Sequence, residues 1–260
     1  MKHTFVICAY QQSEYLEECI VSLEKQTQKS AILIATSTPN TWIYSLADKH
    51  QIPVYVNEGE SGIAGDWNFA LSCAETPYVT IAHQDDIYLP EYSARVVQAL
   101  DAQRAPIIGF TDYCEIRNGQ QVTEIKLLKI TRLMLLPLRS RLLQRWKWVR
   151  RRVLSMGSAI CCPSVVYVRE AFTLPLFQQH FRASVDWETW EVLSRQRGSF
   201  VYCSKVLMGH RIHADSETSA AIQEHVRTQE DYEMFCKFWP VWIARKLSGK
   251  YSRSEASNNL

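Results

Sequence analysis

The sequence predicts an α/β fold in which a mostly parallel sheet is flanked by helices. Short apolar runs of the kind found in buried strands alternate with segments of helical periodicity along the first part of the chain. The 260 residues, of which 47% are hydrophobic, suffice for one sizeable domain or a domain with a subdomain. Strands that alternate with helices in this way form right-handed parallel units. The ligand of such a sheet should lie at the carboxyl ends of its strands.

The N-terminal elements follow in order from these runs. Apolar and β-branched stretches predict strands at 4–9, 31–35, 53–56 and 78–82. The spacing of Leu16, Ile20 and Leu23 predicts a helix between the first two strands. Further helices are predicted around Trp42 and after Gly65. At the carboxyl ends of the strands we therefore expect three polar loops to meet, 9–10, 36–40 and 83–86.

The C-terminal part combines strands, a basic helical insertion and terminal helices. Strands are predicted at 106–110, 164–168 and 200–207, with a polar hairpin at 112–121 and a helix at 186–193. Residues 222–247 have helical character. Pro240 should break or kink them, because proline lacks the amide hydrogen that a helix interior needs.

Positive charge is concentrated in one segment. Residues 126–152 contain ten Lys and Arg and no Asp or Glu, so the net charge of +2 leaves −8 for the remainder of the chain. Leucines, Trp146 and Trp148 alternate with these cations over 126–154, which is typical of an amphipathic element at a membrane interface. Pro137 should divide the segment into two helices.

We expect this segment, 126–154, to bind an anionic membrane surface. Nucleic acid is the rival partner, but we expect none, because the leucine content exceeds what a nucleic-acid groove uses. The remaining alternative is internal, with the leucines packed on the sheet and the cations in solvent.

The cysteines and the apolar runs indicate which cellular compartment to expect. The eight cysteines form no Cys-x-x-Cys pair, and Cys161 and Cys162 are adjacent, so we expect free thiols in a reducing compartment. No apolar run approaches the roughly 18 residues that span a bilayer. We therefore expect neither a signal peptide nor a transmembrane anchor.

The first candidate site is the carboxylate pair Asp85 and Asp86, which follows a predicted strand. Adjacent carboxylates repel each other unless a cation neutralises them. Oxygen ligands on a loop suit Mg²⁺ or Mn²⁺, which keeps several waters and bridges substrate phosphates. Alternatively, the pair caps a helix that starts near Leu89 and Pro90. The pair alone does not decide between these interpretations.

A second motif is the glycine-bearing loop 59–65. Gly59, Gly62 and Gly65 permit a tight turn and close backbone approach before a helix N-terminus, where anions bind. The loop matches neither the Walker nor the dinucleotide-binding pattern, so it predicts no ATP or nicotinamide site. By itself it is a turn.

A third motif combines Asp186 with Trp187 and Trp190 on one predicted helix. A carboxylate beside an aromatic wall can act as a general base, because partial burial raises its proton affinity. The alternative is a helix-capping aspartate next to two core tryptophans.

A fourth motif is the polar loop 209–218. Arg211 and His213 could face phosphate or sugar hydroxyls. His210 and His213 lack the spacing of metal ligands on a helix, and such loop histidines are more often ordinary surface residues.

Together these pieces resemble a family 2 glycosyltransferase with the GT-A fold, of the type that builds bacterial surface polysaccharides. The matching segments are, in order, 5–10, 15–27, 62–68, 84–90, 186–188 and 211–213. Their order and spacing are more specific than any one segment.

The resemblance implies a nucleotide-sugar donor, a divalent cation (Mn²⁺ or Mg²⁺) and a role for each matching residue. Asp86 would hold the metal, and Asp85 would contact the donor's ribose or sugar. Asp186 matches the acid that deprotonates the acceptor hydroxyl, although Val185 stands where the family has a preceding Glu. The other implied donor contacts are Ala9, Tyr10, Thr36, Gly62, Asn68, Arg211, His213 and Ser216.

Three positions depart from the family pattern. Residues 36–38 replace an Asp that usually follows the second strand and reads uracil, His83 stands in place of the first acid of the metal motif, and Trp67 stands where Arg is common. The resemblance therefore still implies glycosyl transfer, but it does not assign the donor's base or sugar.

From these residues we expect an inverting, metal-dependent glycosyltransferase. It would move a sugar from a nucleotide-diphosphate donor to a glycan or lipid-linked acceptor in surface-polysaccharide biosynthesis. We expect it to be cytoplasmic and peripheral at the inner face of the cell membrane. The expected divisions are a donor-binding half 1–110, an acceptor-binding and catalytic half 111–218, C-terminal helices 219–247 and a flexible tail 248–260.

Two rival functions differ in what they require of the sequence. A sugar nucleotidyltransferase would need an N-terminal Gly-rich loop with a basic residue, and residues 5–13 have neither. A non-catalytic adaptor that binds membrane or nucleic acid through 126–154 is the alternative that remains.

Overall fold

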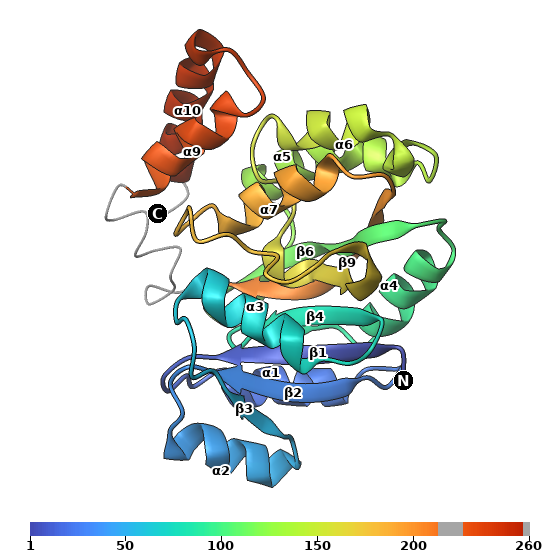
Figure 1. Cartoon of the computed structure of the whole chain (residues 1–260), viewed down its shortest axis with the longest axis vertical. Coiled ribbons are helices and arrows are strands. Elements are labelled where there is room, and N and C mark those ends of the chain that lie inside the picture. The colour runs from blue at the N-terminus through green and yellow to red at the C-terminus, as the bar shows by residue number, and fades with distance from the viewer. Residues whose placement is uncertain (213–225, 257–260) are drawn as a thin grey trace.

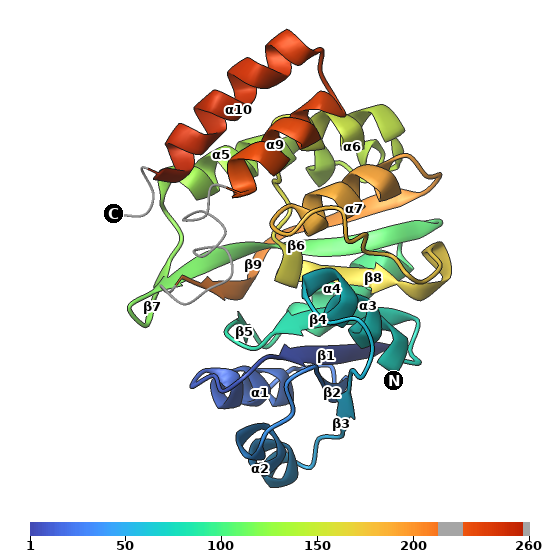
Figure 2. The same ribbon diagram turned by 60° about the vertical axis from the view of Figure 1, so that its left-hand side comes forward.

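The computed structural model of the chain describes residues 1–212 and 226–256. These residues form a nine-stranded mixed sheet in the order β3-β2-β1-β4-β8-β6-β9-β5, with β7 paired to β6 outside this path (Figure 1 and Figure 2). The strands are β1 (His3–Ala9), β2 (Ala31–Thr36), β3 (Val54–Val56), β4 (Tyr78–His83), β5 (Ile87–Tyr88), β6 (Pro106–Arg117), β7 (Gln120–Val122), β8 (Val165–Val168) and β9 (Ser199–Arg211).

The N-terminal strands form the parallel sheet that the sequence predicts. β1 lies parallel to both β2 and β4, and β3 extends the sheet beyond β2. Phe5, Val6 and Ile7 are fully buried, because helices cover both faces of β1. The register pairs the end of β1 with Thr36 and His83. The polar loops after β1, β2 and β4 therefore meet at one edge, as expected.

Helices cover the sheet on both faces, with α3 in front of it and α1 behind it in Figure 1. One cluster of buried apolar side chains joins the sheet to α1, α2 and α4, and a second joins it to α3, α5, α6, α7 and the C-terminal helices. The helices of the N-terminal half are α1 (Leu16–Glu24), α2 (Thr41–His50), α3 (Ile63–Cys73) and α4 (Tyr92–Asp101).

The C-terminal half of the sheet is mixed rather than parallel. β8 runs antiparallel to both β4 and β6, whereas β6 and β9 are parallel to each other. These two strands are longer than predicted. The polar hairpin predicted at 112–121 is present, because the end of β6 pairs antiparallel with β7, but its first residues already belong to the ladder of β6. Asp112 and Glu115 are buried in that strand, where Arg132 and Arg117 neutralise them.

The basic segment forms two short helices joined by turns, with the division near Pro137 that the sequence predicts. Its elements are α5 (Lys126–Leu135), the 3₁₀ turns η1 (Leu136–Arg139) and η2 (Leu143–Arg145), and α6 (Lys147–Leu154). Leu128, Leu135 and Leu138 are buried against the core, whereas Leu142 and Trp148 are exposed. Part of the segment thus packs internally, and part faces solvent.

The chain then leads through η3 (Cys162–Ser164), β8 and η4 (Arg169–Ala171) to α7 (Val185–Ser194), and after β9 to α9 (Val226–Cys236) and α10 (Val241–Ala256). The predicted break at Pro240 separates the last two helices. α10 continues past 247, where a flexible tail was expected to begin, because Tyr251 packs against Trp187 and Phe235. That boundary is corrected. Among the described residues, no helix has the length and apolar character needed to cross a bilayer.

Candidate active site

A cavity of about 800 Å³ opens where the ends of β1, β4 and β9 meet the start of α7. It brings together residues that are far apart in the sequence. Of the catalytic, donor-binding and metal-binding residues predicted from the sequence, those that line it are Ala9, Tyr10, Gly62, Asp85, Asp86, Asp186 and Arg211.

Asp86 sits at the inner wall of this cavity and is 1% exposed. Its carboxylate accepts hydrogen bonds from the His210 Nδ1 at 3.1 Å and from the backbone N–H of Arg211 at 2.9 Å. Burial disfavours charge on both side chains, but their mutual attraction outweighs it. The pKa of Asp86 is therefore lowered and that of His210 raised. The helix-cap interpretation of this pair is wrong, since α4 begins only at Tyr92.

Asp85 has a different environment. Its side chain is partly exposed at the cavity wall, where the Ser13 hydroxyl donates to Oδ1 at 2.8 Å. Its backbone carbonyl accepts from the Arg211 Nε at 2.8 Å. Of the two adjacent carboxylates, Asp85 is thus the more accessible to a ligand.

Arg211 ends β9 and connects that strand to α1. Its guanidinium lies 4.2 Å from the centre of the Tyr15 ring and pairs with Glu18. The residue is only 8% exposed. Most of its donors are therefore committed to holding the walls of the cavity together.

Tyr10 presents an aromatic ring at the cavity mouth and is 50% exposed. The side chain of Gln84 fixes its backbone by bonding both its N–H and its carbonyl at 3.0 Å. An exposed ring on a fixed backbone suits stacking against a planar ligand group.

Two residues named from the sequence lie outside the cavity lining. Thr36 is buried, and its hydroxyl accepts from the backbone N–H of Thr38 at 3.0 Å. The Asn68 side chain bonds the backbone of Leu176 and Phe177 and so holds a different segment. His213 and Ser216 fall outside the described residues.

Asp186 lies in the first turn of α7, on the side of the cavity formed by the C-terminal half of the chain. Burial raises the pKa of Asp186 to about 6, although the Trp187 N–H donates to its carboxylate at 2.7 Å. Trp187 and Trp190 are core residues, as the alternative interpretation held, but the helix cap is Ser184 rather than Asp186. A carboxylate with this proton affinity can accept a proton near neutral pH.

Comparison with known proteins identifies the family. The family model described as "Glycosyl transferase family 2" matches residues 4–165, more than half of the chain. The chain belongs to this family. A search of curated proteins found no match.

Solved structures show that this glycosyltransferase has a GT-A-like fold. S. aureus TarS 1–349 with UDP-GlcNAc is 15% identical at a TM-score of 0.62, with 96% of this chain and 71% of that one covered. The mannosyltransferase PcManGT from Pyrobaculum calidifontis, with GDP-Man and Mn²⁺, is 15% identical at 0.63, with 95% and 69% covered.

A third similar structure is glucosyl-3-phosphoglycerate synthase from Mycobacterium tuberculosis with Mn²⁺ and UDP. It is 14% identical at a TM-score of 0.58, with 88% of this chain and 78% of that one covered. The present chain spans 42% of the longer TarS structure. At these identities the likeness concerns the fold.

The carboxylates of this glycosyltransferase fit a Mn²⁺ or Mg²⁺ ion of the kind expected. Within the described residues, no three His, Cys, Asp or Glu side chains are grouped as a closed metal site. Mg²⁺-type ions at phosphate-transfer sites need only one or two carboxylates, because waters and substrate phosphates complete the shell. Asp85 offers an accessible carboxylate for this, with Asp86 next to it.

Sequence reasoning missed the roles of two histidines. His210 was interpreted as a surface residue, which is wrong, because it pairs with buried Asp86. His83 stacks on Trp67 with ring centres 5.5 Å apart, and its buried Nε2 has no hydrogen-bond partner among the described residues. Burial lowers the pKa of His83, so it is neutral. In the sequence, His83 and Trp67 stand out only because both depart from the family pattern.

Proposed function

We propose that this glycosyltransferase moves a sugar from a nucleotide-diphosphate donor to an acceptor hydroxyl with inversion at the anomeric carbon. The observation that carries the proposal is that one cavity contains both the Asp85–Asp86 pair and Asp186, whose pKa is about 6. The pair lies on the side of β1 and β4, where the family binds its donor. Asp186 lies across the cavity, where an acceptor would enter.

On the donor side, the base would stack near Tyr10 and the diphosphate would approach the carboxylate pair. A bound Mn²⁺ or Mg²⁺ would neutralise the charge of the departing diphosphate. That Asp86 holds this ion stays a prediction. The burial of Asp86 and its bonds to His210 and Arg211 favour Asp85 as the carboxylate in direct contact. Asp86 would then fix the loop that carries Asp85.

On the acceptor side, Asp186 would take the proton of the attacking hydroxyl. Burial makes this carboxylate a stronger base than an exposed aspartate. The acceptor oxygen would then displace the diphosphate directly, which inverts the anomeric configuration. A product that retains the donor's configuration, read from the anomeric coupling in its NMR spectrum, would refute this mechanism.

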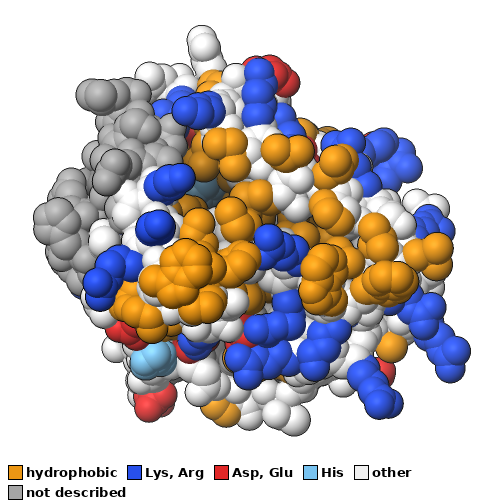
Figure 3. Space-filling model, turned by 90° about the horizontal axis from the view of Figure 1, so that it is seen from above, with side chains coloured by type: hydrophobic (Ala, Val, Ile, Leu, Met, Phe, Trp, Pro, Cys, Tyr) orange, Lys and Arg blue, Asp and Glu red, His pale blue; other side chains and the backbone are white. Residues whose placement is uncertain are grey.

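We propose further that the acceptor is a glycan or lipid-linked glycan of surface-polysaccharide type, reached at an anionic membrane. Figure 3 shows hydrophobic and basic side chains side by side on the face formed by the basic segment and the C-terminal helices. Leu133, Leu142, Trp146 and Trp148 are each at least 60% exposed there. This is the composition that binds a membrane interface reversibly.

Not all ten cations of the basic segment are available to a membrane. Acids from elsewhere pair with three of them, Lys129 with Glu124, Arg132 with Asp112 and Arg151 with Glu191. Arg150 is buried. At about 1 kcal/mol for each cation near an anionic surface, the other six still suffice for peripheral binding.

Thermal-shift measurements with nucleoside diphosphates, with and without Mn²⁺, test the proposed function. A transferase should gain stability from one nucleotide in a metal-dependent way, since a bound ligand stabilises by mass action. The adaptor alternative predicts no such gain. It also predicts that Asp86→Ala leaves membrane binding intact, whereas a transferase would lose donor turnover.

A further inference from the structure

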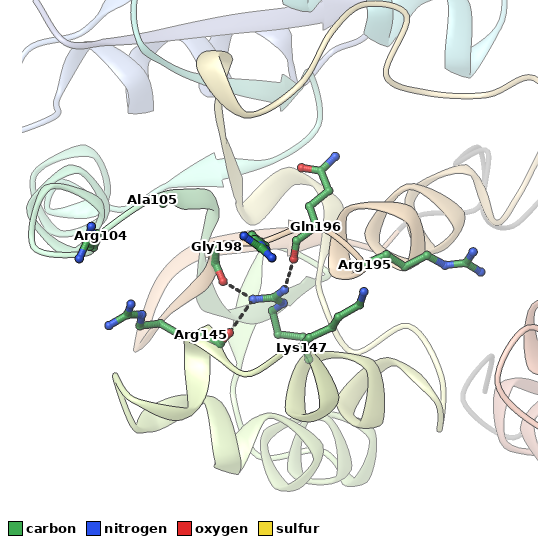
Figure 4. Close-up of a pocket in the computed structure, with 9 residues that line it drawn as sticks. Arg104, Ala105, Arg145, Lys147, Arg195, Gln196 and Gly198 are labelled. Carbon is green, nitrogen blue, oxygen red and sulfur yellow. Dashed lines mark hydrogen bonds between the residues drawn. The ribbon is translucent and has the colours of Figure 1, made fainter.

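A second cavity lies at the opposite end of β6 and β9 from the candidate active site. Its volume is about 390 Å³, and three segments frame it: 104–105 before β6, 195–198 before β9, and 145–150 around the start of α6. In Figure 4 the three segments meet around the gap, and the labelled side chains of Arg145 and Arg195 extend outward from it. β9 has 13 residues and spans roughly 40 Å, so this basic pocket is separate from the cavity that Arg211 lines.

The basic pocket carries an unusual charge. Six of its nine lining residues are cations and none is an acid: Arg104, Arg145, Lys147, Arg150, Arg195 and Arg197. Arg195 pairs with Glu191 at 2.8 Å. Arg104, Arg145, Lys147 and Arg197 form no ion pair within the part of the chain that the structure describes. Exposed cations without partner acids create a positive potential around the cavity, which favours the binding of an anion there.

Arg150 forms the floor of the basic pocket and is 1% exposed. Its guanidinium donates to the carbonyls of Arg145 at 3.2 Å, Ser194 at 3.1 Å and Gln196 at 2.6 Å, and also to that of Gly198 (Figure 4). It thereby ties the α6 wall to the β9 wall. Its Nε has no acceptor among the described residues, and no carboxylate neutralises its buried charge.

The loops that precede β6 and β9 are also held in close contact. Gly198 has a φ of +139°, and a Cβ there would lie 2.5 Å from the carbonyl oxygen of Ala105. The Ser199 N–H donates to that same oxygen at 3.0 Å. Position 198 therefore requires glycine. The backbone segments that carry Arg104 and Arg197 are held in a fixed arrangement by this contact.

We propose that this basic pocket binds a phosphate group, and that the group is the headgroup of an anionic phospholipid. Guanidinium groups bind phosphate oxygens through paired hydrogen bonds, and five arginines line the space. Trp146 and Trp148, which flank Lys147 in sequence, are 60% and 73% exposed. A headgroup in the pocket would therefore place both indoles at the lipid boundary. A soluble phosphate ion would bind through the same contacts, so the test compares lipid vesicles with inorganic phosphate.

Two double variants of equal charge provide the test. R145Q/R197Q removes two cations of the basic pocket, and R139Q/R141Q removes two exposed cations of the same basic segment outside it. Both sites are on the surface, so both variants should fold. Co-sedimentation is measured with vesicles of phosphatidylcholine alone and of phosphatidylcholine mixed equally with phosphatidic acid, at one ionic strength. The pocket variant should lose about tenfold more affinity for the mixed vesicles than the control variant.

Melting temperatures with and without inorganic phosphate separate the two sources. If phosphate stabilises the wild type and R139Q/R141Q but not R145Q/R197Q, while vesicle affinities of the two variants match, the ligand is a soluble phosphate. If the two variants match in both assays, diffuse charge explains the binding and the pocket proposal is overturned. Metal-dependent nucleotide binding should stay unchanged in both variants. Its absence from the wild type would instead count against the proposed transferase function.

Discussion

Three carboxylates of the cavity differ in their surroundings, and those surroundings suggest different roles. Asp86 is buried and paired with His210, Asp85 is accessible, and Asp186 is half-buried with a raised pKa. A group that binds a cation must stay ionised, whereas a base must hold a proton with moderate strength. Residue type alone does not separate these functions, but burial and partners do.

Asp186→Asn should abolish sugar transfer while nucleotide binding survives. The amide keeps the shape but cannot take a proton, and loss of a general base costs about 10²–10⁴-fold in rate. Because burial raises the pKa of Asp186 to about 6, the wild-type rate should fall as the pH drops below about 6. A pH–rate profile flat down to pH 5, or a variant that keeps its rate, would exclude this role.

The same substitution should stabilise the folded protein at high pH. The folded-state pKa of Asp186 is about 6 and its ordinary value 3.8, so above both values the folded state carries a charge that burial disfavours. Asp186→Asn removes that cost, worth up to about 3 kcal/mol. The gain in melting temperature should be full at pH 8 and vanish near pH 3.5, where both states bind the proton. An unchanged melting temperature at pH 8 would mean that the carboxylate is better solvated than its position indicates.

Asp85 and Asp86 should respond differently to replacement by Asn. Asp86→Asn breaks a buried pair with His210 and should lower the free energy of unfolding by about 3 kcal/mol. Asp85→Asn should leave the melting temperature nearly unchanged and remove the Mn²⁺-dependent gain from a nucleoside diphosphate. The opposite pattern, in which Asp86→Asn stays stable and loses only the metal effect, would establish Asp86 as the direct ligand.

At the scale of elements, the start of α3 shows how close backbone packing shapes the loop 59–62. A Cβ at Gly65 would lie 2.2 Å from the backbone oxygen of Glu60, so the loop 59–62 could not keep its path. Gly65→Ala should lower the free energy of unfolding by about 2 kcal/mol and weaken nucleotide binding. Gly249 in α10 has open space around it, so Gly249→Ala should instead stabilise by about 0.5–1 kcal/mol. Equal melting temperatures for the two variants would contradict the tight packing of that loop.

The parallel N-terminal elements could be predicted because their signals are local. Residues 4–9 are a continuous apolar run, and Leu16, Ile20 and Leu23 mark one helix face, so β1 and α1 follow from the sequence directly. β6 could not be bounded in this way. Its buried Asp112 pairs with Arg132, 20 residues further along the chain, and the sequence does not show that these two side chains meet.

The candidate active site could likewise be predicted only in part. Asp85, Asp86 and Asp186 stand beside strands or helices whose ends are visible in the sequence, and the structure brings them to one cavity. The partner of Asp86 was not predictable, since His210 reaches it only through the pairing of β5 with β9. The basic pocket was missed for a similar reason, because its cations come from three distant segments.

At the scale of the whole molecule, the candidate active-site cavity and the charged surface are built from the same sheet. β9 carries Arg211 into the cavity at its end and follows the loop of the basic pocket at its start. The basic segment packs on the core of the sheet through Leu135 and Leu138, and its tryptophans are exposed. Docking on a membrane through that face would therefore hold the cavity in a fixed orientation to the lipid surface.

Replacement of both exposed tryptophans tests this orientation. W146A/W148A should reduce binding to anionic vesicles by about tenfold or more, since each indole would lose its place at the lipid boundary. Tyr44→Ala on α2, an exposed aromatic away from this face in Figure 1, is the matched control and should bind as the wild type does. Raising the salt should weaken binding of all three proteins, because screening shortens the reach of the cations. Binding to neutral vesicles as strong as to anionic ones, or a control as impaired as W146A/W148A, would show that this face is not the docking surface.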